Sequence, residues 1–207
     1  MNRQIKIWSF GDMDRSAKVR WTGEELQYTI EEVRLSVGDH LQSPYRELNP
    51  YGQVPTAELD GSILIESTAI CLSLAERHPE AQLIPYGRDS RDFFWQMVSL
   101  TTTTLEGPIV LYLRSKMGDQ DAAWIDLLER PLARRLQTFA ATLPEEGCLC
   151  GEFTLADVFA AYSLRLALQA DLLAPEGALP AYLRRLMARP AAHSSGFFKS
   201  LEGKIEA

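Results

Sequence analysis

Several features that would narrow the function are missing from this 207-residue sequence. Its only cysteines, Cys71, Cys148 and Cys150, are too few and too unevenly spaced for a disulfide framework. Its histidines are scattered at positions 40, 78 and 193, and the close pair Cys148 and Cys150 has no neighbouring partners for a metal. We therefore expect neither a disulfide-stabilised fold nor a bound metal.

Excess positive charge and long apolar runs are also lacking. The 21 Lys and Arg residues are outnumbered by 28 Asp and Glu residues, so the basic surface typical of nucleic-acid binding is not expected. No apolar segment approaches the roughly 18 residues that span a bilayer. The N-terminal run MNRQIKIWSF lacks the apolar core of a secretory signal. We expect a cytoplasmic protein that binds neither nucleic acid nor membrane.

The first 80 residues alternate strand and helix patterns. Short apolar or alternating runs predict strands at 5–10, 28–35, 54–59 and 62–67, and helical spacing predicts helices at 16–26 and 67–78. The dipeptide DG at 60–61 is a strong hairpin signal between the last two strands. The order β-α-β-(α)-β-β-α indicates a mixed four-stranded sheet covered by helices.

The second half changes character. Amphipathic segments predict helices at about 89–117, 121–142, 154–170 and 178–188, with no convincing strand. Thr154 followed by Asp157 is typical of a capping box at a helix start. We predict an α/β domain at 1–79, a linker at 80–88 and an all-helical domain at 89–207.

Three stretches together resemble the cytosolic glutathione transferases. The run NPYGQVPTAELDGSILIESTAICLSLAERHP (49–79) is similar to the family's glutathione-site core, which reads N-P-x-G-x-V-P, a hairpin, then E/Q-S and a helix. The family's first helix and second strand are similar to residues 18–35, KVRWTGEELQYTIEEVRL. The capping motif of the family's helical domain is similar to residues 153–165, FTLADVFAAYSLR. The resemblance implies a thioredoxin-like domain with a cis-proline and a C-terminal helical bundle, in a bacterial theta- or zeta-like protein.

The resemblance also implies where the co-substrate glutathione binds. A cis bond between Val54 and Pro55, next to Gln53, would expose the Val54 backbone to the cysteinyl part of the ligand. An ordinary trans proline opening an edge strand is the alternative. Ser67 and the N–H groups of the helix start are suited to the γ-glutamyl carboxylate, and Glu66 to its ammonium group. Ser67 as a simple N-cap is the alternative, and both roles are compatible.

Two polar residues match positions that contact other parts of glutathione in related classes. Gln53 and His40 occupy the positions whose side chains contact the glycyl carboxylate and the cysteinyl region in those classes, especially the theta class. GDHL (38–41) resembles the theta-like G-x-H-L pattern. For His40, a solvated loop histidine is the alternative.

The loop WSFGDMDRSAKVRW (8–21) departs from the family pattern. An ungapped alignment with zeta-type sequences, matched at Val19-Arg20, places Met13 where the activating serine is usual. A thioether cannot donate a hydrogen bond. We predict Ser16, and after it Ser9, as the donor to the glutathione sulfur, with backbone N–H groups at the helix start as further candidates. Either serine could instead be an ordinary helix or sheet residue.

Met13 is then expected to line a pocket for the electrophile. Glu106 and Tyr112, in the long segment 93–114, are further candidates for its wall, although the aromatic spacing there also fits core packing. The pocket side chains do not identify the electrophile.

The implied function is a metal-free glutathione transferase reaction. A homodimer would add the glutathione thiolate to small hydrophobic electrophiles, as in detoxification. The alternatives are glutathione-dependent isomerisation, dehalogenation or peroxide reduction, and a non-catalytic binding or regulatory module. Met13 favours the last alternative, whereas the complete set of glutathione-binding residues argues against it.

Overall fold

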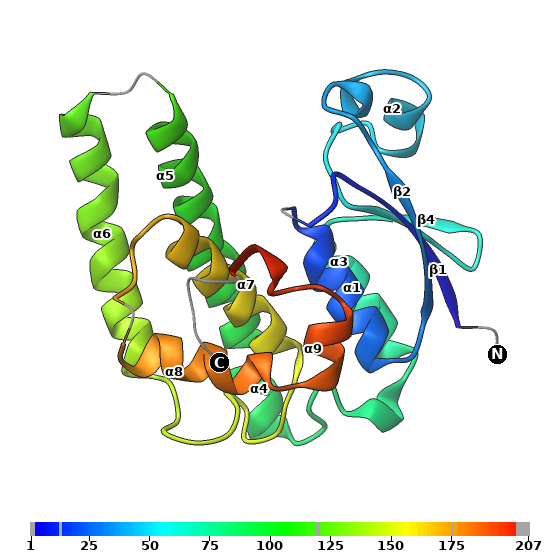
Figure 1. The fold of residues 1–207 in the computed structure, drawn as a ribbon. Helices are drawn as coiled ribbons and strands as arrows, with labels where there is room; N and C mark the ends of the chain where they lie inside the picture. Colours follow the sequence, from blue (N-terminus) through cyan, green and yellow to red (C-terminus); the bar gives the residue numbers. More distant parts are fainter. Residues whose placement is uncertain (1–2, 13, 119–120, 175, 202–207) are drawn as a thin grey trace. The chain divides into compact units, whose positions relative to one another are not determined.

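A computed structural model describes residues 3–12, 14–118, 121–174 and 176–201 (Figure 1). The chain forms two compact units, one of residues 3–84 with Pro190–Ser200, the other of Pro85–Arg189 with Leu201. The division at position 84 falls within the linker expected at 80–88. Whether each unit is an independent domain with the predicted limits stays a prediction.

The first unit contains the predicted mixed sheet. Its strands lie in the order β2-β1-β3-β4, with bounds β1 (Gln4–Ser9), β2 (Thr29–Arg34), β3 (Thr56–Leu59) and β4 (Ser62–Ile65). β1 is parallel to β2, and β3 is antiparallel to both β1 and β4. Asp60 and Gly61 form the β3–β4 turn with positive φ, as the DG signal predicts. The thioredoxin-like topology expected from the sequence is confirmed.

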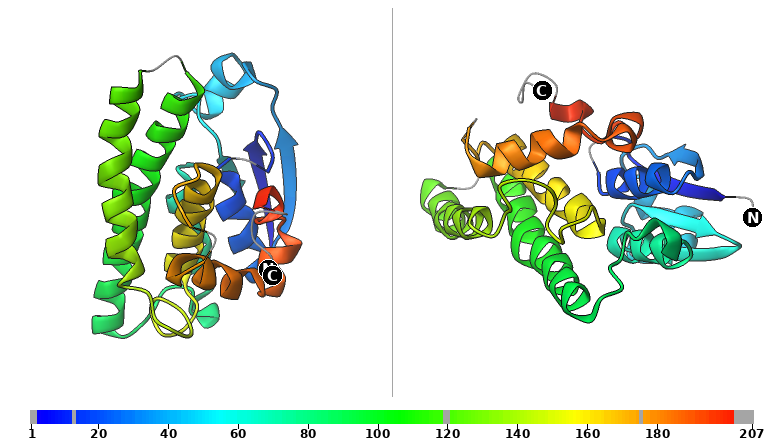
Figure 2. Two further views of the ribbon diagram at one scale, coloured as in Figure 1. Left: turned by 60° about the vertical axis from the view of Figure 1, so that its left-hand side comes forward. Right: turned by 90° about the horizontal axis from the view of Figure 1, so that it is seen from below.

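Helices α1 (Ser16–Glu25) and α3 (Ser67–Glu76) lie side by side on one face of this sheet (Figure 2). Residues Ile5 and Ile7 of β1 are buried, as the alternation of a one-sided strand requires. α1 runs without a break through Gly23, where a Cβ atom would lie 2.9 Å from the Ile30 side chain. Glycine at this position therefore allows the close approach of α1 to β2.

Short helical segments connect and flank these elements. Between β2 and β3 lie η1 (Asp39–Leu41) and α2 (Tyr45–Leu48), and η2 (Pro79–Ala81) follows α3. α9 (Pro190–Ser194) packs against α1, and Trp21 of α1 makes edge contacts with Phe197 and Phe198. These contacts attach the segment after the helical unit to the first unit.

The second unit is helical, as predicted. It contains α4 (Arg88–Ser99), α5 (Gly107–Met117), α6 (Ala122–Ala140), α7 (Leu155–Gln169) and α8 (Ala178–Met187). The last described element, η4 (Lys199–Leu201), has its first two residues in the first unit. α7 is buried on nearly all sides and forms the centre of this unit. None of the helices in the described ranges is long and apolar enough to cross a membrane.

α4 and α5 are joined by a π-helical segment, η3 (Leu100–Glu106), that contains the four-threonine run. A π-helix changes the backbone hydrogen bonding of the helix, and side chains of neighbouring helices bond to carbonyl groups here. Ser163 of α7 donates to the Thr101 carbonyl at 2.9 Å, and Arg135 of α6 donates to the Thr104 carbonyl at 3.3 Å. The threonine run thus belongs to the packing of three helices.

The capping box at the start of α7 is confirmed. Thr154 accepts a hydrogen bond from the Ala156 N–H at 3.3 Å, and Asp157 accepts one from the Thr154 N–H at 2.8 Å. Asp157 also accepts bonds from the Leu149 N–H at 2.9 Å and from the Tyr182 hydroxyl at 2.5 Å. The local capping signal is therefore also the centre of a buried network.

Candidate functional site

The C-terminal ends of β1 and β2 meet at one end of the sheet. The two strands are parallel, and their register pairs Ser9 with Arg34. The loop 10–15, which leads into α1, and the segment that leads to η1 therefore leave the sheet at the same end (Figure 1).

The β3–β4 hairpin brings the remaining segments to this end. Its register pairs Thr56, the first residue of β3, with Ile65, the last residue of β4. Pro55 and Glu66 are the next residues outward on the two strands. Since Thr56 also pairs with Trp8 of β1, the topology gathers the glutathione-binding residues predicted in the first unit around one end of the sheet.

The turn before β3 is fixed by side chains that the sequence reasoning did not single out. The Val54–Pro55 bond is cis, as expected from the resemblance. The Gln53 carbonyl accepts hydrogen bonds from the Tyr45 hydroxyl at 2.5 Å and from the Asn49 amide at 2.8 Å. Burial raises the pKa of the Tyr45 phenol, which keeps this donor protonated. The sequence could have indicated Asn49, because it is the first residue of the N-P-x-G-x-V-P run. No sequence pattern indicates Tyr45.

The junction between β4 and α3 has an unusual backbone. Glu66 has φ 68° and ψ 109°, a conformation that is rare for a residue with a side chain. Such conformations are unfavourable and concentrate at functional positions. Ser67 follows as the first residue of α3 and is buried, and the first N–H groups of a helix have no partner within it. Glu66 and Ser67 thus stand at a helix N-terminus, where backbone N–H groups favour a negative charge.

His40 lies in η1 and packs edge-on against Phe10, with ring centroids 4.9 Å apart. Its Nδ1 atom is buried and has no hydrogen-bond partner among the described residues. Gly52, at φ 59°, lies so close that a Cβ atom there would be 2.9 Å from the His40 carbonyl oxygen. The segment before Val54 therefore packs directly on η1, and one ring nitrogen of His40 is buried beside it without a hydrogen-bond partner among the described residues.

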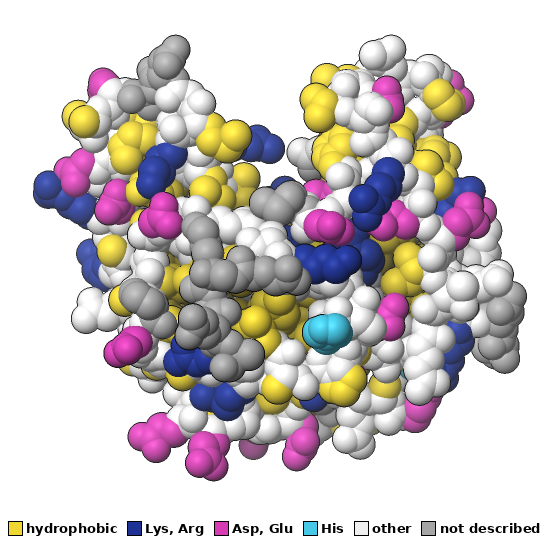
Figure 3. Space-filling view, in the orientation of Figure 1, with side chains coloured by type: hydrophobic (Ala, Val, Ile, Leu, Met, Phe, Trp, Pro, Cys, Tyr) yellow, Lys and Arg dark blue, Asp and Glu magenta, His cyan; other side chains and the backbone are white. Residues whose placement is uncertain are grey.

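The loop between β1 and α1 is closed by Asp14. Its carboxylate accepts backbone hydrogen bonds from Phe10 at 2.5 Å and from Ser16 at 2.6 Å. Asp12 faces two arginines instead, with Arg34 at 3.6 Å and Arg20 at 4.0 Å. Acidic and basic side chains are intermixed over the start of α1 on the face shown in Figure 3. Met13 lies outside the described residues.

The two serines predicted as donors are both fully buried and hydrogen-bonded within the first unit. Ser9 donates to the Glu32 carboxylate at 2.6 Å and accepts a bond from the Gly11 N–H at 3.0 Å. Ser16 accepts a bond from the Arg20 guanidinium at 2.8 Å, and among the described residues its own proton reaches the Gly11 carbonyl alone, at 3.4 Å. The Ser16 proton is thus much more weakly held than that of Ser9.

The two residues predicted for the electrophile pocket in the helical unit are both buried. Glu106 is the last residue of η3. Tyr112 of α5 donates its hydroxyl proton to Glu129 of α6 at 2.7 Å, and burial raises the pKa of Tyr112 to about 12. This hydroxyl links two helices, while the pocket role of either residue stays a prediction.

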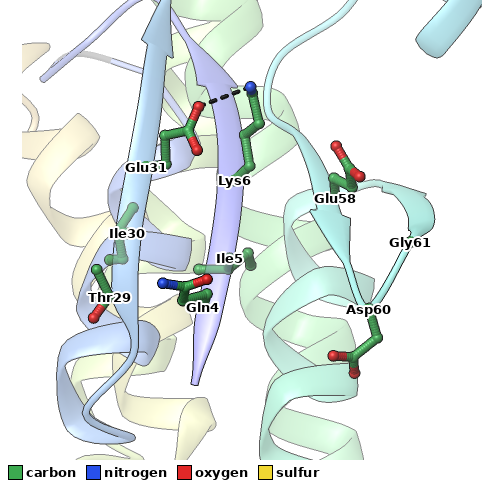
Figure 4. A pocket seen from close by; sticks show the side chains of 9 residues that line it. All are labelled: Gln4, Ile5, Lys6, Thr29, Ile30, Glu31, Glu58, Asp60 and Gly61. Carbon is green, nitrogen blue, oxygen red and sulfur yellow. Dashed lines mark ion pairs between the residues drawn. The ribbon is translucent and has the colours of Figure 1, made fainter. Parts of the chain in front are cut away.

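A separate depression of about 650 Å³ lies over the opposite end of the sheet (Figure 4). Lys6, Glu31, Glu58 and Asp60 contribute its charged side chains, and Lys6 forms an ion pair with Glu31 at 2.7 Å. Within the described residues, no group of His, Cys, Asp and Glu side chains is placed to hold a metal ion. None of the predicted site residues that the structure describes lines this depression, which is therefore distinct from the end of the sheet where β1 and β2 terminate.

The chain matches the family model described as "Glutathione S-transferase, N-terminal domain" over residues 14–82. It is 32% identical over 162 residues to glutathione S-transferase GstA of Escherichia coli O157:H7, covering 76% of this chain and 77% of that protein. It is 26% identical over 166 residues to glutathione S-transferase Z1 of Arabidopsis thaliana, covering 76% and 75% of the two chains.

A solved structure matches nearly the whole chain. It is the theta-class glutathione S-transferase of Xanthomonas axonopodis pv. citri with glutathione bound, with a TM-score of 0.80 and 27% identity. The match covers 94% of this chain and 97% of that one. The similarity therefore extends through both compact units.

Proposed function

Because the chain belongs to the glutathione S-transferase family, we propose that it binds glutathione and adds its thiolate to small hydrophobic electrophiles. The main support is the convergence of the 53–55 turn, the Glu66–Ser67 junction, His40 and the loop 10–15 at one end of the sheet. Glutathione is a tripeptide with a carboxylate at each end, so it needs two separated anion contacts and a contact to its extended backbone between them. This end of the sheet offers residues for each of the three contacts.

The proposed contacts follow the chemistry of each segment. Val54 pairs through its backbone with the cysteinyl residue of glutathione, next to the cis Pro55. Ser67 and the N–H groups of α3 receive the γ-glutamyl carboxylate, and Glu66 its ammonium group. Gln53 and His40 bind the glycyl end and the cysteinyl region. The Nδ1 atom of His40 supports this assignment, because it is buried without a hydrogen-bond partner in the described parts of the chain and a ligand would satisfy it.

Thiolate formation requires a stabilising contact of known size. A thiol pKa of about 8.5 must fall by about two units, or roughly 2.7 kcal/mol, for the thiolate to predominate at neutral pH. One charge-assisted hydrogen bond supplies about 1.5–3 kcal/mol. We propose Ser16 as the donor ahead of Ser9, because Ser16 would give up only a 3.4 Å bond and Ser9 a 2.6 Å bond to a carboxylate. Backbone N–H groups at the start of α1 are the remaining candidates.

Three further predictions accompany this function. We propose that Met13, Glu106 and Tyr112 contribute to the electrophile pocket, and that the chain acts as a homodimer in the cytoplasm. Sedimentation analysis tests the dimer, and a monomer at micromolar concentration would contradict it.

Titration of the bound thiol tests the proposal most directly. Thiolate absorbance of the glutathione complex, followed against pH, should show a pKa well below that of free glutathione, and an unchanged pKa would contradict the transferase mechanism. Ser16→Ala should lower turnover with an activated aryl chloride by about tenfold to a hundredfold, the equivalent of one charge-assisted hydrogen bond. Ser9→Ala, assayed in parallel, should lower it less.

Calorimetry tests the binding site independently of turnover. Ser67→Ala should weaken glutathione binding because the γ-glutamyl carboxylate loses a hydroxyl contact. Ser73→Ala serves as the matched control, because Ser73 lies in α3 six residues after Ser67 and away from the helix start. Unchanged affinity in Ser67→Ala would contradict the assignment.

A second candidate is a glutathione-binding module without substantial catalysis. The observation that favours it is the internal hydrogen bonding of both serine hydroxyls. For such a module, calorimetry would detect glutathione binding while the thiol pKa stays at its solution value.

A further inference from the structure

Four charged side chains, Asp12, Arg20, Glu32 and Arg34, form a closed ring beside the start of α1. Arg20 Nη1 lies 2.6 Å from Glu32, whose other carboxylate oxygen lies 3.8 Å from Arg34. Arg34 in turn lies 3.6 Å from Asp12, and Asp12 lies 4.0 Å from Arg20 Nη2. The charges alternate around the ring and sum to zero.

The inner half of this ring is shielded from solvent. The side chain of Arg20 is 9% exposed and that of Glu32 is 19% exposed, against 41% for Asp12 and 63% for Arg34. Charges interact more strongly where water is excluded, and one left without its partner there is costly. The Arg20–Glu32 pair is therefore the fixed part of the ring.

Arg20 also controls the Ser16 hydroxyl. Its guanidinium donates to the Ser16 oxygen at 2.8 Å and to the Gly11 carbonyl at 3.1 Å. A guanidinium cannot accept a hydrogen bond, so the proton of Ser16 must point away from Arg20. A cation that donates to a hydroxyl oxygen also polarises its O–H group. Arg20 thus makes Ser16 a stronger donor, whose proton faces the Gly11 carbonyl through a long bond of 3.4 Å that a better acceptor can replace.

Glu32 has the opposite effect on Ser9. It accepts the Ser9 proton at 2.6 Å, while the Ser9 oxygen accepts the Gly11 N–H at 3.0 Å. With its single proton bound to a carboxylate, Ser9 has none to offer a ligand unless this bond breaks. The Arg20–Glu32 ion pair therefore leaves the Ser16 proton weakly held, whereas it fixes Ser9, whose oxygen accepts the Gly11 N–H.

We infer that Arg20 and Glu32 are positioning residues for thiolate formation: they hold Gly11 and direct the Ser16 hydroxyl toward the glutathione sulfur. The ring also neutralises Asp12 and Glu32, two carboxylates whose charge would otherwise oppose a nearby thiolate. Neither residue is proposed to touch glutathione. The inference rests on the proposed function, because it concerns the activation of the bound thiol.

The test compares Arg20→Met, Arg20→Lys and Glu32→Gln with Glu31→Gln as the matched control. Glu31 adjoins Glu32 on β2, and its variant removes the same charge, but its ion-pair partner is Lys6 rather than Arg20. Thiolate absorbance gives the pKa of bound glutathione, calorimetry gives the affinity, and assays at saturating and limiting glutathione separate kcat from KM. Circular dichroism establishes that each variant is folded.

Arg20→Met and Glu32→Gln should raise the pKa of the bound thiol by about one unit, which lowers the thiolate fraction and kcat about tenfold below that pKa. Below the pKa of the bound thiol, the affinity for glutathione should stay at the wild-type value, because the proposed contacts to the ligand backbone are intact. Above that pKa the affinity should fall by up to about tenfold, because thiol ionisation and binding are linked. Arg20→Lys, which keeps the charge but not the fork of donors, should restore part of kcat. Glu31→Gln should match the wild type in every measurement.

Three outcomes would overturn the inference. Folded Arg20→Met and Glu32→Gln proteins with the wild-type thiol pKa and kcat would show that the ring does not act on the thiol. An equal effect of Glu31→Gln would assign the change to net charge rather than to the ring. If wild-type protein itself binds glutathione with an unshifted thiol, the proposed function fails together with the inference, whereas the first two outcomes leave it intact. If Arg20→Met does not fold, Glu32→Gln, which keeps the shape of the side chain, decides the test.

Discussion

Glu32 in the first unit and Asp157 in the helical unit are both carboxylates withdrawn from solvent, but their partners differ in kind. Glu32 is held by the guanidinium of Arg20 at 2.6 Å, with Arg34 at 3.8 Å. Asp157 is fully buried and accepts hydrogen bonds from neutral donors: the N–H groups of Leu149 and Thr154 and the hydroxyls of Thr154 and Tyr182.

The kind of partner decides what a buried carboxylate contributes to the molecule. Neutral donors fix the backbone around Asp157, so this network joins the start of α7 to α8 and to the preceding loop. Paired charges at Glu32 neutralise each other and leave the loop 10–15 with no net charge from the ring. The first arrangement serves folding, and we propose that the second serves the chemistry of the site.

The largest expected effect comes from removing the carboxylate with neutral partners. Asp157→Ala should lower the free energy of unfolding by about 3–5 kcal/mol, because it removes the capping box and leaves several buried donors unsatisfied. Urea unfolding followed by circular dichroism measures this loss. Tyr182→Phe, which removes a single donor, is the control and should lose less. A loss in Asp157→Ala no greater than in the control would contradict the central role of the carboxylate.

Breaking the paired charges should have a smaller effect on stability. Arg20→Met leaves Glu32 without its nearest cation and should cost about 2–4 kcal/mol, since the partly exposed Arg34 still faces the carboxylate. The same urea experiment measures it. A loss larger than that of Asp157→Ala would reverse the comparison and make the ring the stronger structural element.

The pH dependence of stability should report on the protonation of Asp157. Burial raises the pKa of Asp157 above its ordinary value of 3.8, so the folded chain binds this proton more tightly than the unfolded chain. The stability that protonation contributes is complete below pH 3.8 and is lost as pH rises through the folded pKa. Urea midpoints of the wild type and of Asp157→Asn between pH 4 and 7 should therefore draw closer, or cross, as pH rises. A constant difference would contradict the raised pKa.

The smallest effect is expected at the exposed ion pair on the same two strands. Lys6 and Glu31 lie 2.7 Å apart, but their side chains are 36% and 68% exposed, so solvent screens the attraction. Lys6→Met should leave the urea midpoint and the turnover with glutathione unchanged. A clear loss of turnover would show that charges anywhere on β1 and β2 influence the site.

The sequence predicted the elements of this fold well where the signals were local. The DG turn and the capping box of Thr154 and Asp157 depend on residues a few positions apart, and both have the expected form in the structure. The helix predicted at about 89–117 is instead divided by the π-helical segment η3 into α4 and α5, because its packing against neighbouring helices is not visible in local spacing. The cis Val54–Pro55 bond came instead from the resemblance, because an isolated X-Pro pair favours the trans form.

The candidate site was predicted less completely. Its segments were found because the N-P-x-G-x-V-P and E-S patterns are contiguous. Arg20 served only to align the chain, and Glu32 and Tyr45 had no assigned role, since their contacts cross between elements. Nothing in the order of residues 9 to 34 shows that Ser9, Arg20 and Glu32 share hydrogen bonds.

The sequence by itself determined most of the secondary structure, the family and the segments proposed to form the glutathione site, because these depend on spacing along the chain. Only the tertiary structure decided that the Ser9 proton is bound to Glu32 while that of Ser16 is weakly held. The reason is geometric: the register of β1 with β2 and the rotation of α1 bring Arg20 between Glu32 and Ser16, and no local pattern encodes either.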